Sequence, residues 1–214
     1  MKKTTWLLSA ALMVSGSVVA GQSKTYEVTI TNITGGQIFT PVLAATHKSD
    51  VAFFELGMPA SEALEVQAES GNPMPLKDYL ESMPGSVQDV VVLDGVLIMP
   101  GESVSFEIEG SSRFSQLSFS AMLVPTHDSF VALDSMRLPR YSTMKTARAY
   151  DAGTEINDEL CINIPGPCAG EGYSSDGGEG YVHVANGIHG IGDLLPEEND
   201  WRNPVAKVTV RRVW

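Results

Sequence analysis

The amino-acid sequence predicts an all-β protein folded as an antiparallel β-sandwich, and three observations support this fold class. Apolar and polar residues alternate with period two in several short segments, as they do in strands that bury one face. Turns rich in glycine and proline separate these segments, and helical periodicity is confined to the 60–83 region. Short strands joined by tight turns are typical of sandwiches, with a closed barrel as the less favoured alternative.

The alternating pattern locates the strands along the chain. The predicted strands are residues 25–33, 37–47, 103–110, 116–126 and 205–214. In the first of these, Tyr26, Val28 and Ile30 alternate with polar residues, and Gly35-Gly36 then supplies a turn into the second. The other segments repeat this pattern, so each strand is expected to bury one face.

The 60–83 region breaks the β pattern and predicts two short helices. Residues 61–70 carry apolar side chains near helical spacing, and this pattern stops before Gly71. Residues 75–83 begin with a proline and place four apolar side chains on one helical face. We expect the two helices to cover an end or an edge of the sandwich.

Residues 1–20 have the three parts of a secretory signal peptide: two lysines, an apolar run, and small residues before a cleavage site. The apolar run is shorter than the roughly 20 residues that a spanning helix needs, which disfavours a membrane anchor. We expect cleavage after Ala20 and a mature domain of residues 21–214, exported to a periplasm or secreted. Gly21 is not a lipidatable cysteine, and no later segment predicts a transmembrane helix.

The chain is acidic, with a formal net charge of −12. Loss of residues 1–20 removes two lysines and no acidic residue, so the mature chain carries −14. This charge argues against nucleic acid and anionic lipid as non-specific partners. The negative charge favours cations as binding partners instead.

The two cysteines, Cys161 and Cys168, are predicted to form a disulfide. An isolated pair in an exported chain is typical of a disulfide, and the Pro-Gly-Pro between the cysteines favours a reversing loop. The chain-entropy model gives about 2.5 kcal/mol for a ring of this size. The alternative, a zinc site, needs two further ligands, and His183 is the closest histidine in the sequence.

Motifs for covalent chemistry are missing from the sequence. The segment GYSSDGG fails the G-x-S-x-G pattern of a nucleophile elbow, because Asp176 replaces the last glycine. The histidines are His47, His127, His183 and His189, and none has H-x-x-x-H spacing. His183 alternates with apolar neighbours, so we expect a satisfied structural histidine there. The sequence therefore predicts a protein that is not an enzyme.

An acidic segment, residues 149–159, is expected to be a loop. Its four carboxylates belong to Asp151, Glu155, Asp158 and Glu159. Gly153 permits the chain to fold back, so that the side chains of Asp151 and Glu155 can reach one ion. Calcium accepts several oxygen ligands in the irregular geometry of a loop, although this spacing is not that of an EF-hand. The alternative is a solvated acidic turn.

Four further segments, taken together, resemble the spondin N-terminal domain family, which occurs in F-spondin, in mindin and in exported bacterial proteins. The segments are Pro125-Thr126-His127-Asp128-Ser129-Phe130, Ala132-Leu133-Asp134-Ser135, Tyr150-Asp151-Ala152-Gly153-Thr154-Glu155, and Pro204-Val205-Ala206 running to Arg211-Arg212. The Tyr-Asp-Ala-Gly-Thr run is the most specific part. The resemblance extends over essentially the whole mature chain.

The resemblance implies a C2-like antiparallel β-sandwich that binds calcium at one end. The family's calcium ligands fall on Asp128, Asp151 and Glu155, where Glu155 is longer by one methylene than the aspartate of the animal proteins. Asp134 matches another acid of the family and is expected to be structural, accepting hydrogen bonds from serine or backbone donors. Asp158 is expected to face solvent.

Two classes of function follow from these observations. The first is an exported calcium-binding module that binds or adheres to an unidentified surface, glycan or protein partner. The second is an exported metal-assisted hydrolase, in which Asp128, Asp151 and a histidine such as His189 surround a catalytic ion. Ligands that are all oxygen favour the module, whereas a histidine ligand beside a deep pocket favours the hydrolase.

Overall fold

The structure is a computed structural model that describes residues 22–173 and 177–214. The predicted signal peptide, residues 1–20, lies outside the described residues. In the described ranges, no helix is long and apolar enough to cross a membrane.

Antiparallel strands make up most of the fold, as the sequence predicts. The strands are β1 (Lys24–Asn32), β2 (Ile38–Phe39), β3 (Leu43–His47), β4 (Val87–Val92), β5 (Ser103–Gly110), β6 (Gln116–Val124), β7 (Ser129–Arg137), β8 (Ser142–Asp151), β9 (His183–Val184) and β10 (Ala206–Arg212). The helices are α1 (Glu62–Ser70), α2 (Met74–Glu81) and α3 (Pro196–Asn199), and short 3₁₀ turns span Cys161–Asn163 and Gly166–Cys168. The expected all-β class and the two expected helices are confirmed.

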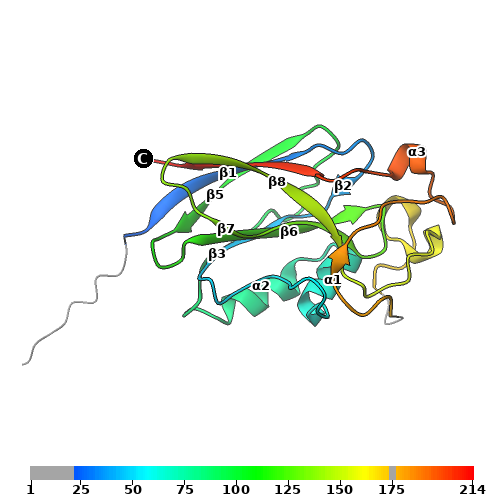
Figure 1. Cartoon of the computed structure of the whole chain (residues 1–214), viewed down its shortest axis with the longest axis horizontal. Coiled ribbons are helices and arrows are strands. Elements are labelled where there is room, and N and C mark those ends of the chain that lie inside the picture. The colour runs from blue at the N-terminus through cyan, green and yellow to red at the C-terminus, as the bar shows by residue number, and fades with distance from the viewer. Residues whose placement is uncertain (1–21, 174–176) are drawn as a thin grey trace, which may run out of the picture.

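The strands form a sheet in the order β4-β3-β6-β7-β8-β10-β1-β5, which folds over into two facing layers. Strand β8 joins the layers, because its first half pairs with β10 and its last four residues pair with β7. Figure 1 shows β1, β5 and β10 above β3, β6 and β7, with β8 crossing between them. This arrangement is the predicted β-sandwich.

The protein has two apolar cores. The larger core lies between the layers and includes the fully buried Ile30, Leu117 and Phe119. The smaller core lies under α1 and α2, where Leu64 and Leu80 pack in the same cluster as residues of β3 and β7. Full burial of one such side chain contributes about 1.5–3 kcal/mol. The helices cover the outer face of the lower layer, as Figure 1 shows.

Helix α1 has the boundaries that its sequence predicts. The hydroxyl of Ser61 accepts a hydrogen bond from the backbone N–H of Leu64, which caps the first turn. Gly71 ends the helix in the left-handed conformation, with φ of 70°.

The structure differs from the sequence prediction in three places. The segment 37–47 forms two strands instead of one, because Pro41 lies between them and has no N–H to donate. Strands β4, β7, β8 and β9 are additional to those predicted from alternation. The expected loop 149–159 begins later than predicted, because β8 continues to Asp151.

Candidate metal centre

Two neighbouring strands bring the predicted ligands to one end of the sandwich. Ser129, the first residue of β7, pairs with Asp151, the last residue of β8. Asp128 therefore lies beside the end of β8, and its carbonyl oxygen accepts a hydrogen bond from the backbone N–H of Ala152 at 3.2 Å. The chain then turns at Gly153 and brings Glu155 back to the same end.

Gly153 makes this turn possible for two reasons. Its φ of 68° lies in the left-handed region, which favours glycine. A Cβ atom at this position would also lie 2.3 Å from the carbonyl oxygen of Tyr181. The neighbouring loop can therefore pack directly on the acidic turn, and Gly180 donates a hydrogen bond to the carbonyl of Gly153 at 2.8 Å. The expected role of Gly153 in folding the chain back is confirmed.

Asp128 is fully buried, and its two carboxylate oxygens have different environments. Oδ2 accepts hydrogen bonds from the backbone N–H groups of Thr154 at 2.7 Å and Glu155 at 3.1 Å. Oδ1 is buried and has no hydrogen-bond partner among the described residues. Burial, together with the nearby charge of Asp151, raises the pKa of Asp128 to about 7.

Glu155 is buried as well, and it too has a carboxylate oxygen without a donor. Its Oε2 has no hydrogen-bond partner in the described part of the chain. The Nδ1 atom of His127 is 3.8 Å from this oxygen, which is beyond hydrogen-bond reach. Burial raises the pKa of Glu155 to about 8, and the charges of Glu69 and Asp128 act in the same direction.

Asp151 differs from the other two because both of its oxygens have donors. Oδ1 accepts from the backbone N–H of Gly153 at 2.8 Å, and Oδ2 accepts from Asn157 Nδ2 at 3.0 Å. Burial raises the pKa of Asp151, and the charge of His183 opposes this increase. The three predicted ligands are therefore all buried at one end of the molecule.

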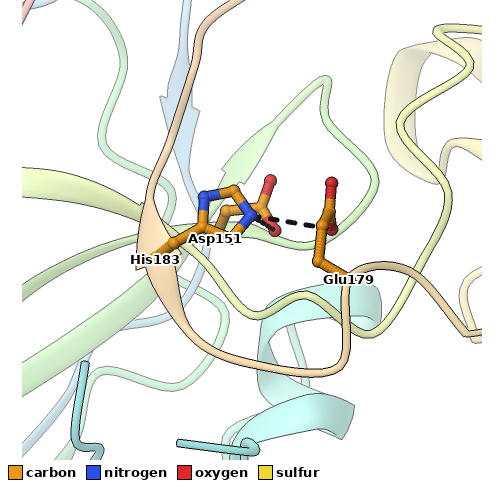
Figure 2. A group of neighbouring side chains, drawn as sticks. All are labelled: Asp151, Glu179 and His183. Carbon is orange, nitrogen blue, oxygen red and sulfur yellow. Dashed lines mark ion pairs between the residues drawn. The ribbon is translucent and has the colours of Figure 1, made fainter. Parts of the chain in front are cut away.

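A second group of ligating side chains shares Asp151. Among the described residues, Asp151, Glu179 and His183 are the group whose ligand atoms all lie within 4.8 Å of one another. Figure 2 shows the ring of His183 directed toward the two carboxylates. The sequence prediction did not include Glu179 or His183 as ligands.

The expectation that His183 is a satisfied structural histidine stays a prediction, because its Nε2 faces two carboxylates that would serve a protonated ring as ion-pair partners. Its Nδ1 lies 3.0 Å from the carbonyl oxygen of Val184, but its Nε2 is buried without a hydrogen-bond partner among the described residues. The alternation with apolar neighbours does place His183 in a strand, β9. That strand pairs with the end of β8, where His183 lies opposite Asp151. The E-x-x-x-H spacing from Glu179 was the signal available in the sequence.

The other two acids of the segment have partners within the protein. The carboxylate of Glu159 accepts hydrogen bonds from the backbone N–H groups of residues 189–191 at 2.5–2.9 Å. Asp158 does not simply face solvent as expected, because its oxygens accept from Leu160 N and Asn163 Nδ2. Asp158 Oδ1 also lies 3.1 Å from Nε2 of the buried His127. These two acids organise the loops around the site.

Two further predictions, the disulfide and the structural role of Asp134, are confirmed. Cys161 and Cys168 form a disulfide within the loop that follows the site. Asp134 is structural, since its carboxylate accepts hydrogen bonds from the backbone of Phe53 and from the hydroxyl of Ser118.

A cavity of about 180 Å³ opens beside these groups. Asp151 and Glu179 contribute to its wall, together with His127, His189 and Trp201. The Nε2 atom of His189 contacts the carbonyl oxygen of Asn186 at 3.2 Å. His189 therefore has a partner in the loop, and it is not part of the group of close ligand atoms.

A comparison with known protein families shows to which family this chain belongs. The family model described as Spondin_N matches residues 24–157, which is more than half of the chain. The chain belongs to the Spondin_N family. The matched region contains Asp128, Asp151 and Glu155, and it ends before Glu179 and His183.

Human Spondin-2 is one relative of this Spondin_N protein. The two sequences are 29% identical over 124 residues, which cover 55% of this chain and 38% of Spondin-2. The chain thus spans less than half the length of that relative.

Proposed function

We propose that this Spondin_N protein is an exported calcium-binding module that binds or adheres to a protein or glycan partner. The observation that supports the calcium site is the pair of buried oxygens without donors, Asp128 Oδ1 and Glu155 Oε2. A buried carboxylate oxygen without a partner costs considerable free energy unless a cation or a proton satisfies it. A calcium ion would supply the positive charge that the described residues do not.

The available ligands suit calcium. Asp128, Asp151 and Glu155 offer only oxygen atoms, and loops between strands can add carbonyl oxygens and water. Calcium accepts six to eight oxygens in flexible geometry, whereas magnesium demands a near-ideal octahedron and dehydrates reluctantly. The ion would tie the turn before β7 to the turn after β8.

The size of the cavity supports a binding module over the alternative, a metal-assisted hydrolase. Sites for small molecules typically enclose roughly 300–1,000 Å³, and the cavity beside Asp151 measures about 180 Å³. His189, the histidine of the hydrolase hypothesis, is held by Asn186.

Exposed apolar side chains in the same loops support a macromolecular partner. Ile156, Ile162 and Ile191 are each more than 60% exposed. Exposed apolar side chains gathered in one region of a protein surface mark interaction sites. Export is supported by the predicted signal peptide and by the disulfide, which is typical of oxidising compartments.

Thermal melting tests the calcium site. A site with a Kd of about 10⁻⁴ M adds about 1.4 kcal/mol of stability at about 1 mM calcium. Calcium should therefore raise the midpoint relative to chelator, and magnesium should raise it less. Asp151→Asn should remove most of this response.

Glu107→Gln is the matched control because it removes one carboxylate far from the site. Glu107 is exposed on β5 and pairs with Glu27 of β1. The β10 neighbour of Glu27 is Arg211, which pairs with Ser142 at the far end of β8 from Asp151. A wild-type midpoint that ignores calcium, or an equal loss of response in both variants, would refute the proposed site.

A further inference from the structure

We propose that Asp151, Glu179 and His183 form a second cation site, which takes a divalent transition-metal ion of the zinc class. This site shares Asp151 with the proposed calcium site, but Glu179 and His183 play no part in the calcium proposal. Both residues also lie beyond the region that matches the family model. The second site is therefore a property of this chain's own loops.

The hydrogen bonding of His183 prepares it as a ligand. A carbonyl oxygen can only accept, so the contact of Nδ1 with the carbonyl of Val184 at 3.0 Å places the ring proton on Nδ1. In the neutral ring, Nε2 then carries a lone pair. Histidine ligands of metals typically donate their other N–H to a carbonyl or carboxylate in this way.

When the ring is neutral, the lone pair on Nε2 of His183 points toward acceptors and finds no donor. Nε2 lies 3.3 Å from Asp151 Oδ1 and 3.6 Å from Glu179 Oε2, as the dashed lines in Figure 2 mark. Nε2 is buried and has no hydrogen-bond partner within the described residues. Either a cation between these three atoms or a proton on Nε2 would satisfy them.

The two separations from Nε2 match those around a small metal ion. Ligands at about 2.0–2.1 Å from a tetrahedral zinc ion lie about 3.3 Å from one another. The two separations from Nε2, 3.3 and 3.6 Å, are close to this value. The cavity of about 180 Å³, lined by Asp151 and Glu179, leaves room for water as a further ligand.

The ligand types select the class of ion. Imidazole nitrogen is a ligand of zinc, nickel, copper and iron, whereas calcium and magnesium prefer oxygen alone. In the described ranges, no lysine or arginine forms an ion pair with Asp151 or Glu179, so their charge is left to the imidazole or to an ion. The competing arrangement is a protonated His183 that pairs with the two carboxylates.

Cobalt and zinc binding to the purified protein distinguishes the two arrangements. We expect one Co²⁺ per chain, detected by its visible ligand-field absorption, and displacement of that ion by Zn²⁺. His183→Gln and Glu179→Gln should each weaken binding at least about tenfold. Loss of a group that only hydrogen-bonds a metal ligand already weakens binding by about this factor. Glu179 is 41% exposed, so its substitution should not impair folding.

His189→Gln is the matched control, because it removes a histidine that lines the same cavity but lies outside the ligand group. It should bind Co²⁺ as the wild type does. His183→Gln should also keep the calcium response of the wild type, which separates this site from the calcium site. The proposal is overturned if the wild type binds neither Co²⁺ nor Zn²⁺, or if His183→Gln binds them as tightly as the wild type.

Discussion

Asp128 illustrates how a single residue can be costly in the metal-free fold and still be suited to the proposed calcium ion. Its Oδ2 is held by the backbone of Thr154 and Glu155, while its buried Oδ1 has no donor within the described residues. An asparagine could keep the first oxygen as an acceptor and place an N–H₂ donor where the second oxygen lies. The amide would also remove a negative charge from beside Asp151.

Asp128→Asn should therefore change stability in opposite directions with and without calcium. In chelator above about pH 7, we expect the variant to be more stable than the wild type, on the order of 1–3 kcal/mol, because a buried negative charge beside Asp151 is removed. In calcium, the advantage should disappear, because the variant gains nothing from the ion. Urea unfolding of both proteins in both conditions measures this. A variant that is less stable than the wild type in chelator contradicts the prediction.

The raised pKa values of Asp128 and Glu155 predict how stability depends on pH. The pKa of each carboxyl is higher in the folded protein, about 7 and about 8, than in the unfolded chain. The folded state therefore holds extra protons between the unfolded pKa values, about 4, and the folded ones, so stability falls as pH rises from about 4 to about 8 and then levels off. In chelator, the midpoint should decrease between about pH 5 and pH 8, while calcium should flatten this decrease by replacing the protons. A metal-free midpoint that rises over this range contradicts the prediction.

The residues of the candidate site were only partly predictable. Spacing around Gly153 and the family resemblance identified Asp128, Asp151 and Glu155, because these signals are local in sequence. His183 reaches Asp151 only through the pairing of β9 with β8. Apolar alternation around His183 predicts a strand, but it does not predict which strand pairs with it. The same alternation also suits a structural histidine.

At the scale of elements, the end of β8 depends on close backbone packing. The loop that contains Tyr181 lies directly against Gly153, with no room for a Cβ atom. Gly153→Ala should therefore destabilise the protein by more than about 1 kcal/mol, because strain at positive φ adds to a clash with a carbonyl oxygen. It should weaken the calcium response as well, since the turn positions Glu155.

Gly85→Ala provides the comparison, since nothing lies within 4 Å of a Cβ atom built there and φ is not positive. Thermal melts in calcium and in chelator measure both variants. Equal midpoints for the two variants would show that the turn can relax around the added methyl group.

Elements with one buried face were predictable, and elements in other environments were not. Strand β5 alternates between exposed and buried residues and was predicted at its observed limits. The first four residues of β7 are buried in succession, because α1 and α2 cover the other face of that layer. Alternation disappears in such a strand, and only the family resemblance indicated it. Strand β8 is largely polar in its first half, which hides it from hydrophobic patterning.

At the scale of the whole molecule, the fold requires a strand from outside the family match. The match ends at residue 157, but β10 lies between β1 and β8 in the sheet. Without β10, strands β1 and β5 lose their strand pairing to β8 and thus to the other layer. A fragment of residues 22–157 should therefore fail to unfold cooperatively in urea, whereas a chain of residues 21–214 should show one sigmoidal transition. A cooperative transition for the fragment would show that the matched region folds alone.

The pairing of β1 with β10 has a consequence for the order of events in the cell. The first strand of the sandwich needs the last strand as its neighbour, so a long segment must be made before the pair can form. Contacts between such distant parts of a chain form slowly. A chain that is threaded through an export pore must stay unfolded until it has passed, and β10 is made after every other strand of the described sandwich. In the proposed export, this topology would delay pairing of β1 until β10 has also reached the far side of the membrane.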